Sequence, residues 1–350
     1  MKLGDTHNFG KFVQTYGENW VLKPRTTEWE QLFFSKRSWL RKLITDICLK
    51  NNISNPFSVI PALEFRTINQ QNLVEKFDNQ LNTDAEINTE NVSSMASVLA
   101  LLTWFGVSDL HVDNVKVGFN SSKNFYIVPF DIESIFNAHI LPSETWLIPP
   151  HKKNCKMAGF ESIKFLIVKN ESYIKAFLKC YIDMFLLLDS LSEIIETKFK
   201  INSNLINAPI RVIIRNTQDY QEYLKNRFAN NNFLIEELIQ LHRNDVPYFY
   251  RKLSSPGKVY YFIDPELSIS IDESNELALE ILTRIENRSF IKLNSNLTQT
   301  CIEAGSLEIF AWLMRDCSNF KFSDYEFNLQ KNHSNIKIVY HGKVNVEANI

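Results

Sequence analysis

The segment Asp109-Leu110-His111-Val112-Asp113-Asn114 decides the fold and the chemistry that we expect of this chain. Seventeen residues after Asn114, a second acidic pair, Asp131 and Glu133, follows the apolar run 125–130. A carboxylate, an amide and a further carboxylate directly after a strand are the groups that phosphoryl transfer requires. One carboxylate orients or deprotonates the accepting hydroxyl, while the amide and the second carboxylate hold magnesium on the nucleotide phosphates. The spacing therefore predicts ATP chemistry.

Length and composition are those of an ordinary globular protein. The 350 residues are 45% hydrophobic and 22% charged, which allows one large core or two lobes. The formal net charge of −2 gives no sequence-wide basic field that would recruit nucleic acid or an anionic membrane. Five scattered cysteines without C-x-x-C spacing indicate reduced thiols in a cytoplasmic protein. The apolar run 176–191 contains Lys179 and Asp183, so it predicts a core helix and no membrane span.

The pattern of strands and helices around the Asp109 segment predicts an α+β protein with two lobes, similar to protein and lipid kinases. The expected elements are a hairpin (9–23), a helix (28–50), a strand (59–65), a helix (92–105), a strand (125–130), helical sequence (170–199), a strand (210–214), two helices (218–230 and 232–242), an aromatic strand region (247–263) and a helix (273–287). A small N-lobe (1–66) would contain the hairpin and one helix. A larger, mainly helical C-lobe (67–325) would follow, with 326–350 as a peripheral tail. Nucleotide would lie between the lobes, beside a hinge at 63–66.

Lys23 is the first candidate for nucleotide binding, because it ends the second hairpin strand, where an ammonium can reach the phosphates. That role requires an acidic partner on the following helix, and Glu28 and Glu30 are both candidates. Asp109 is the candidate catalytic base or hydroxyl-orienting group, and His111 could position either Asp109 or a phosphate.

The candidate metal ligands are Asn114 and Asp131, whose hard oxygens suit magnesium, and Glu133, which could bind a second ion or fix the loop. The sequence contains no G-x-x-x-x-G-K-[ST] or G-x-G-x-x-G motif, and the hairpin has only Gly10 and Gly17. A kinase built from this chain would therefore have an atypical phosphate cover.

A second group of polar residues has no standard use in a kinase: Asp5, His7, Arg211, Arg215 and Thr217. Two arginines at the end of a strand beside a threonine could bind a phosphate through forked hydrogen bonds. Elimination of phosphate from a phosphorylated hydroxyl residue would need such a site for the leaving group, together with a base for the α-proton. An ordinary exposed strand end explains the arginines equally well.

Taken together, the motifs resemble the dehydratase domain of class II lanthipeptide synthetases, the LanM enzymes. The matching segments follow the family's order over roughly residues 3–310: Gly4-Asp5-Thr6-His7, Leu22-Lys23-Pro24-Arg25, Leu63-Glu64-Phe65, Ser108-Asp109-Leu110-His111-Val112-Asp113-Asn114, Phe130-Asp131-Ile132-Glu133, Arg211-Val212-Ile213-Ile214-Arg215-Asn216-Thr217 and Asp245-Val246-Pro247-Tyr248-Phe249.

The resemblance implies a kinase-like fold and two reactions on a precursor peptide. ATP would phosphorylate Ser or Thr, and elimination of the phosphate would leave dehydroalanine or dehydrobutyrine. The residues implied for nucleotide, magnesium and phosphoryl transfer are Lys23, Arg25, Glu64, Asp109, His111, Asn114, Asp131 and Glu133. Those implied for elimination are His7, Arg211 and Thr217, with Asp5 supporting the same site.

The chain also departs from the family's pattern. Full-length synthetases have a long region before the G-D-x-H motif and a cyclase with a Cys/Cys/His zinc site after the dehydratase. We therefore expect no cyclisation by this chain, and separate cyclase or activation-domain proteins as possible partners. The Trp usually found two residues before the hinge Glu is Ala62 here. Two alternatives stay open, which are a Ser/Thr kinase without elimination and a non-catalytic remnant that binds peptide or nucleotide.

Overall fold

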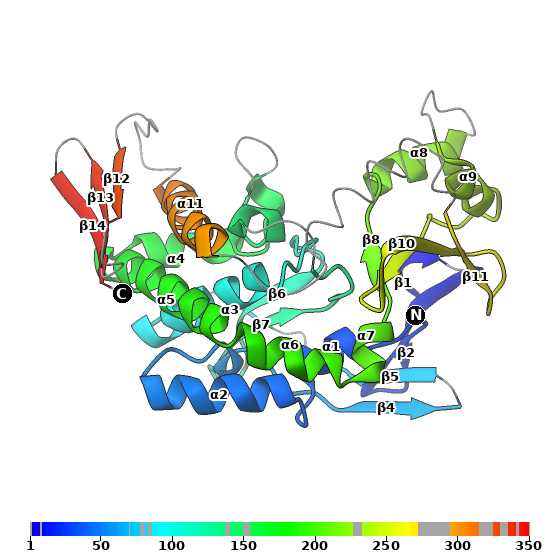
Figure 1. Cartoon of the computed structure of the whole chain (residues 1–350), viewed down its shortest axis with the longest axis horizontal. Helices are drawn as coiled ribbons and strands as arrows, with labels where there is room; N and C mark the ends of the chain where they lie inside the picture. The colour runs from blue at the N-terminus through cyan, green and yellow to red at the C-terminus, as the bar shows by residue number, and fades with distance from the viewer. Residues whose placement is uncertain are drawn as a thin grey trace.

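The computed structural model describes residues 2–7, 9–69, 71–77, 81–82, 86–136, 141–149, 155–226, 233–271, 295–314, 325–329, 335–340 and 343–349. An antiparallel sheet and two helices form the N-terminal part, and buried helices form the middle of the molecule. Two further sheets lie to the left and right of these helices in Figure 1. The mixed composition of helix and sheet confirms the expected α+β class.

The N-terminal sheet has five antiparallel strands in the order β1-β2-β3-β5-β4. These strands are β1 (Lys2–His7), β2 (Lys11–Tyr16), β3 (Trp20–Lys23), β4 (Phe65–Ile68) and β5 (Gln71–Glu75). The predicted hairpin is confirmed: β2 and β3 pair from Gln14↔Leu22 to Tyr16↔Trp20, around Gly17 with its left-handed φ of 63°. The boundary expected after residue 66 instead falls inside β4, whose ladder with β5 keeps the chain in this sheet to Glu75.

Two helices follow β3, where the sequence predicted one. These are α1 (Glu28–Phe34) and α2 (Trp39–Asn51), and the chain leaves helical geometry between them at Ser35. The Ser38 hydroxyl then caps α2 by accepting the N–H of Arg41, which is a strong local signal to restart a helix. The strand expected at 59–65 is also wrong: a 3-10 helix, η1 (Pro56–Ser58), precedes irregular chain, and strand geometry begins only at Phe65.

The helical body is centred on α3 (Thr89–Trp104) and α5 (Glu171–Ser190), which pack against each other. Nearly every residue of α3 from Val92 onward is buried, so this helix has no solvent-facing stripe. One continuous hydrophobic core runs from α1 through α3 and α5 to α11 (Ser295–Met314). The ring of Trp29 in α1 packs edge-on against that of Phe136, with 5.6 Å between ring centres, and the ring of Phe33 packs edge-on against that of Phe105, with 5.3 Å between centres. The helix α1 is therefore fixed to the body as well as to the sheet.

A two-stranded hairpin carries the Asp109 segment into Asp131. It consists of β6 (Val115–Phe119) and β7 (Phe125–Pro129), paired from Val115↔Pro129 to Phe119↔Phe125. The expected strand at 125–130 is thus confirmed, whereas β6 was not predicted. The pairing places Asn114 next to Phe130, whose N–H donates to the Asn114 carbonyl at 2.8 Å.

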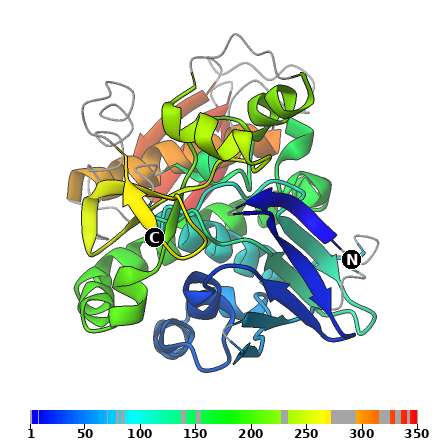
Figure 2. The ribbon, with the colours of Figure 1, turned by 90° about the vertical axis from the view of Figure 1, so that its right-hand side faces the viewer.

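The remaining elements surround this framework: η2 (Pro142–Thr145), η3 (Cys155–Met157), η4 (Glu161–Ile163), α4 (Lys164–Val168), α6 (Ser192–Lys200), α7 (Ser203–Asn207), β8 (Ile210–Val212), α8 (Thr217–Asn226), α9 (Ile235–His242), β9 (Phe249–Lys252), β10 (Ser255–Phe262), β11 (Ser268–Ser270), β12 (Tyr325–Leu329), β13 (Asn335–Tyr340) and β14 (Lys343–Asn349). A four-stranded sheet, β11-β10-β9-β8, lies beside β1 and β2 (Figures 1 and 2).

The C-terminal end departs from the sequence prediction. The helix expected at 273–287 lies outside the described residues. The segment expected as a peripheral tail forms the sheet β12-β13-β14, and β14 lies against α5. Among the helices that the structure describes, none is long and apolar enough to span a membrane.

Candidate functional site

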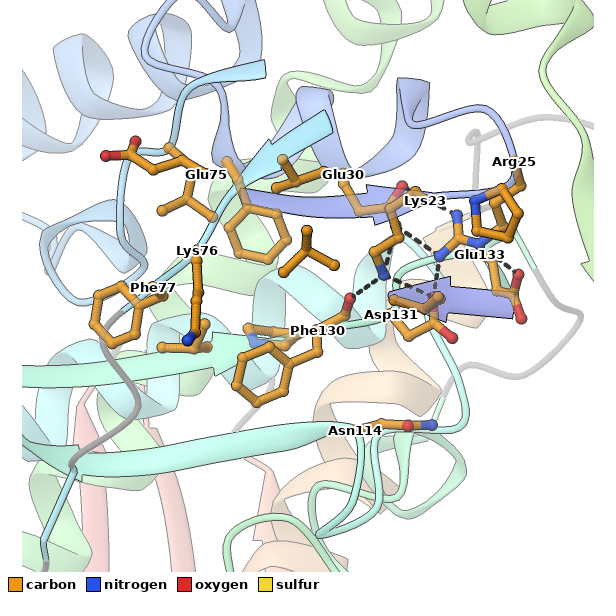
Figure 3. A pocket seen from close by; sticks show the side chains of 18 of the residues that line it. Lys23, Arg25, Glu30, Glu75, Lys76, Phe77, Asn114, Phe130, Asp131 and Glu133 are labelled. Carbon is orange, nitrogen blue, oxygen red and sulfur yellow. Dashed lines mark hydrogen bonds and ion pairs between the residues drawn. The ribbon is translucent and has the colours of Figure 1, made fainter. Parts of the chain in front are cut away.

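A cavity of about 440 Å³ lies where the N-terminal sheet meets the β6–β7 hairpin (Figure 3). Its volume falls within the range of about 300–1,000 Å³ that is usual for small-molecule sites. Apolar side chains line one part of it: Phe12, Val13, Val21, Phe34, Leu63, Val74, Phe77, Val128 and Phe130. Charged side chains line the other: Lys23, Arg25, Glu30, Asp131, Glu133 and Arg211. The cavity can therefore hold a ligand with one flat apolar portion and one anionic portion.

Lys23 is fixed at the boundary between these two parts. It ends β3, a central strand paired on both sides, and it is buried at 9% exposure. Its Nζ donates to the Phe130 carbonyl at 2.9 Å and lies 3.6 Å from a carboxylate oxygen of Glu30 and of Asp131. Of the two acidic partners expected on the following helix, the structure thus brings Glu30 to Lys23. Glu28 lines a different, outer pocket, which Lys36 and Glu64 also border.

Arg25 connects the carboxylates of the site. Its guanidinium binds Glu30 at 2.6 Å, Glu133 at 3.0 Å and Asp131 (Figure 3). Burial opposes ionisation of Asp131, but Arg25 and Lys23 outweigh it and hold the pKa of that carboxyl well below its ordinary value. Burial likewise opposes the charge of Arg25, and its acidic neighbours raise the pKa of the guanidinium instead. Asp131 and Arg25 are therefore both charged at neutral pH.

Arg211 reaches the same carboxylate cluster from β8. Its guanidinium binds Glu133, and its backbone N–H donates to the Glu133 carbonyl at 2.8 Å. The guanidinium also lies 5.8 Å from the centre of the Tyr248 ring, and Tyr248 lines the cavity. Burial raises the pKa of the Tyr248 hydroxyl, so this group is a neutral hydrogen-bond donor at physiological pH. Together these contacts place one cation and one neutral hydroxyl at the charged end.

Asp109 occupies a strained loop beside this cluster. Its φ of 67° is left-handed, a conformation that non-glycine residues adopt mostly at functional or tightly held positions. Its neighbours hold it there: Ser108 N donates to the Ser134 carbonyl at 3.0 Å, and Leu110 N donates to the Thr145 carbonyl at 2.9 Å. Burial raises the pKa of the Asp109 carboxyl, and the charge of Arg211 partly opposes that rise. A higher pKa makes the carboxylate a better proton acceptor.

His111 and Asn114 hold the Asp109 loop from the other side. The Asn114 amide donates to the Asp109 carbonyl at 2.8 Å. The Nδ1 of His111 accepts the N–H of Asp113 at 3.3 Å, and the amide nitrogen of Asn114 lies 3.3 Å from the other ring nitrogen, Nε2. That nitrogen lies 3.6 Å from a carboxylate oxygen of Asp109. His111 is therefore placed to orient Asp109, as one of the two roles predicted for it requires.

The residues expected to hold magnesium fit that ion in part. Asn114 and Asp131 both line the cavity, at neighbouring strand ends, and offer the one or two protein oxygens that magnesium takes beside phosphates. Among the described residues no group of three or more His, Cys, Asp or Glu is arranged to hold a metal, so a dense all-protein site is not present there. Both carboxylate oxygens of Glu133 bind arginines, which suits the second of the two roles expected for it, that of fixing the loop.

The side chain of Glu64 lies outside the cavity, contrary to the sequence prediction. It was expected at the hinge and in contact with the nucleotide, but its side chain is 47% exposed and forms ion pairs with Lys36 at 3.4 Å and Arg66 at 3.2 Å. Its neighbour Leu63 lines the cavity, whereas Glu64 borders the pocket outside it. At the end of β5 and just beyond it, Glu75, Lys76 and Phe77 line the cavity instead.

Of the residues predicted for elimination, the structure brings Arg211 alone to the cavity lining among those whose side chains it describes. Thr217 is the first residue of α8 and does not line the cavity. Arg215 is tied away from it by the buried carboxylate of Glu237, at 2.8 Å. Asp5 and His7 belong to β1, and their side chains lie outside the described residues.

The sequence interpretation missed Tyr248 and the cavity segment 75–77. Tyr248 was part of a matched motif without a role, and the apolar pair Leu73-Val74 ahead of segment 75–77 was the signal for a further strand. Comparison of the chain with models of protein families and with curated proteins gives no match.

Proposed function

We propose that this chain transfers a phosphoryl group from ATP to Ser or Thr of a peptide and then eliminates the phosphate, as a lanthipeptide dehydratase does. A kinase-like, two-lobed fold is part of the proposal. It is supported by the order of the elements: an antiparallel sheet with Lys23 on its third strand, a helix with its acidic partner, and a loop–hairpin unit ending in Asp131.

The observation that carries the proposal is the convergence of Lys23, Glu30 and Asp131 at the charged end of the cavity. In phosphoryl transfer a strand lysine held by a helix glutamate binds the nucleotide phosphates, and an aspartate after a strand binds their metal. The three residues come from β3, α1 and the segment after β7, and the ammonium of Lys23 lies 3.6 Å from a carboxylate oxygen of each of the other two. Adenine would occupy the apolar part, next to segment 75–77.

Phosphoryl transfer to a hydroxyl needs a proton acceptor and charge compensation. The proton of the Ser or Thr hydroxyl would pass to Asp109, the oxygen would bond to the γ-phosphorus, and the bond to the ADP oxygen would break. Asn114 and Asp131 would hold magnesium, which neutralises charge on the phosphates. Arg25 and Arg211 add positive charge at the same end of the cavity.

Elimination would use the same end of the cavity. A base removes the α-proton of the phosphorylated residue, the bond from Cβ to oxygen breaks, and phosphate leaves. Arg211 and the Tyr248 hydroxyl would bind the leaving phosphate; in support, both residues line the cavity, and Arg211 pairs with Glu133 there. The resemblance implies a part in elimination for His7, and His7 would serve as this base.

One observation favours the simpler alternative, a peptide kinase without elimination. Neither Thr217 nor Arg215 lines the cavity, although the resemblance gives the position of Thr217 a role in elimination. A chain with only the first activity would release phosphopeptide as its product.

Mass spectrometry of a Ser/Thr-rich peptide incubated with the chain, ATP and magnesium separates these functions. Loss of one water per modified residue supports the dehydratase, and a stable gain of one phosphoryl group supports the kinase. The variant Arg211→Ala then tests the second step: we expect phosphopeptide to accumulate, whereas equal loss of both products would contradict a separate role for Arg211. No mass change with any peptide tested would count against both enzymes.

A further inference from the structure

The turn between β1 and β2 is bound by the carboxylate of Asp245, a residue distant in sequence. Phe9 and Gly10 both have left-handed backbones, with φ of 66° and 73°. The N–H of Phe9 donates to Oδ2 of Asp245 at 2.7 Å, and the N–H of Gly10 donates to Oδ1 at 2.9 Å. Successive N–H groups in such a turn form a concave site for an anion. The chain fills this site with its own anion.

Arg243 completes the contact. Its guanidinium lies 3.9 Å from the centre of the Phe9 ring, and its Nε is 3.5 Å from Oδ2 of Asp245. A further nitrogen donates to the Phe262 carbonyl at 3.1 Å, which anchors the arginine on β10. Asp245 itself is 1% exposed, so its two charge-assisted hydrogen bonds are shielded from water. We call this set of Asp245, Arg243 and Phe9 the turn latch.

The position of the turn latch suggests what it does. The residue two before Phe9 is His7, at the end of β1, and the residue three after Asp245 is Tyr248, at the cavity. Tyr248 leads into β9, which pairs with the strand of Arg211. The latch therefore joins the end of β1 to the segments that carry Tyr248 and Arg211. Because the turn's two N–H groups already bind Asp245, they do not contribute to phosphate binding in this arrangement.

We propose that Asp245 is a positioning residue, which holds the β1–β2 turn so that the end of β1 faces Tyr248 and Arg211 during the second reaction step. The proposal rests on the proposed function for its catalytic consequence and on the geometry alone for the latch. Loss of the carboxylate should speed hydrogen exchange at the turn and slow elimination by about tenfold or more, the scale expected when a reacting group is misplaced. Binding of MgATP should stay within about twofold of wild type, since Lys23 and Arg25 are untouched.

The test compares Asp245→Asn with Asp264→Asn, an exposed aspartate in the loop after β10 whose carboxylate caps only a local turn. Amide exchange at Phe9 and Gly10, calorimetric binding of MgATP, and the ratio of phosphopeptide to dehydrated peptide are measured for both. We expect faster exchange and a raised phosphopeptide fraction only in Asp245→Asn. Unchanged exchange would overturn the latch. Tighter MgATP binding would also overturn the proposal, because it would show that the freed N–H groups serve the nucleotide.

Two further outcomes are decisive. If Asp245→Asn does not fold, Phe9→Ala tests the latch from the turn side, and unchanged exchange at Gly10 in that variant would refute it. If wild type modifies no peptide, the proposed function fails while the exchange measurement still decides the latch. Wild-type dehydration with an unchanged product ratio in Asp245→Asn would reject the positioning role and leave the dehydratase standing.

Discussion

Replacement of Glu30 by glutamine tests the arrangement of the cavity most directly. Glu30 is 2% exposed and binds Lys23 at 3.6 Å and Arg25 at 2.6 Å. Removing one partner of a buried ion pair usually costs about 3–5 kcal/mol, because the other charge is left uncompensated. Here both cations keep Asp131, so we expect a smaller loss of about 1–2 kcal/mol in unfolding free energy. Lys23 would also lose the contact that aims it, and MgATP should bind about tenfold more weakly, equivalent to about 1.4 kcal/mol.

The matched control is Glu28→Gln, because Glu28 is two residues away on the same helix but borders the outer pocket. Calorimetric titration with MgATP and urea unfolding should be run on both variants and on wild type. We expect weaker nucleotide binding in Glu30→Gln and near-wild-type binding in Glu28→Gln. Equal affinities in the two variants would refute the assignment of Glu30 as the partner of Lys23, whatever happens to stability.

Three further predictions concern the Asp109 loop, its packing and the charge cluster. Asp109→Asn should abolish phosphopeptide formation while MgATP binding persists, as measured by mass spectrometry and calorimetry; residual turnover near wild type would exclude Asp109 as the base. Gly159→Ala should destabilise the fold by about 1–3 kcal/mol in urea unfolding, since a Cβ there would lie 2.3 Å from Val115 and 2.7 Å from the Leu110 carbonyl, and unchanged stability would contradict this packing. Wild type should lose stability below about pH 4 more steeply than Asp131→Asn. The pKa of Asp131 is depressed in the fold, so its carboxylate stabilises the fold at any pH above the pKa of the unfolded chain, by about 1.4 kcal/mol per unit of pKa depression, and this contribution is lost as pH falls. Parallel curves of stability against pH for the two proteins would refute this role.

The parts of the fold that follow local rules were predictable. The hairpin before Lys23 has a glycine turn between two alternating strands, and α3 is a long apolar run with an asparagine cap. The break at Ser35 was not predicted, because hydrophobic spacing continues through it and the capping serine stands within the pattern. The strand β5 was missed for a different reason: it has five residues, its apolar pair Leu73-Val74 is a weak signal, and pairing with β3 and β4 on its two sides fixes it.

The missed strand β5 also explains why Glu64 was expected at the cavity. β4 is the edge strand of the sheet, so Glu64 just before it lies at the sheet's outer edge, whereas Glu75 of the inner strand β5 lines the cavity. The grouping of the residues near Asp109 was predictable, because one short motif and one strand contain them. The contact of Asp245 with Phe9 spans 236 residues, and no local pattern of charge or hydrophobicity signals such a pairing.

The ion pairs of the cavity also distinguish which carboxylate can serve a metal. Lys23, Arg25 and Arg211 face Glu30, Asp131 and Glu133, so three cations meet three carboxylates. Arg25 contacts all three carboxylates, whereas Arg211 forms its ion pair, among the described residues, with Glu133. If Asp131 turned to a magnesium ion, Arg25 would keep Glu30 and Glu133, and Lys23 would keep Glu30. If Glu133 turned instead, Arg211 would lose its only carboxylate partner among the described residues. Because an unpaired buried cation is costly, Asp131 is the ligand that can be recruited at the lower free-energy cost.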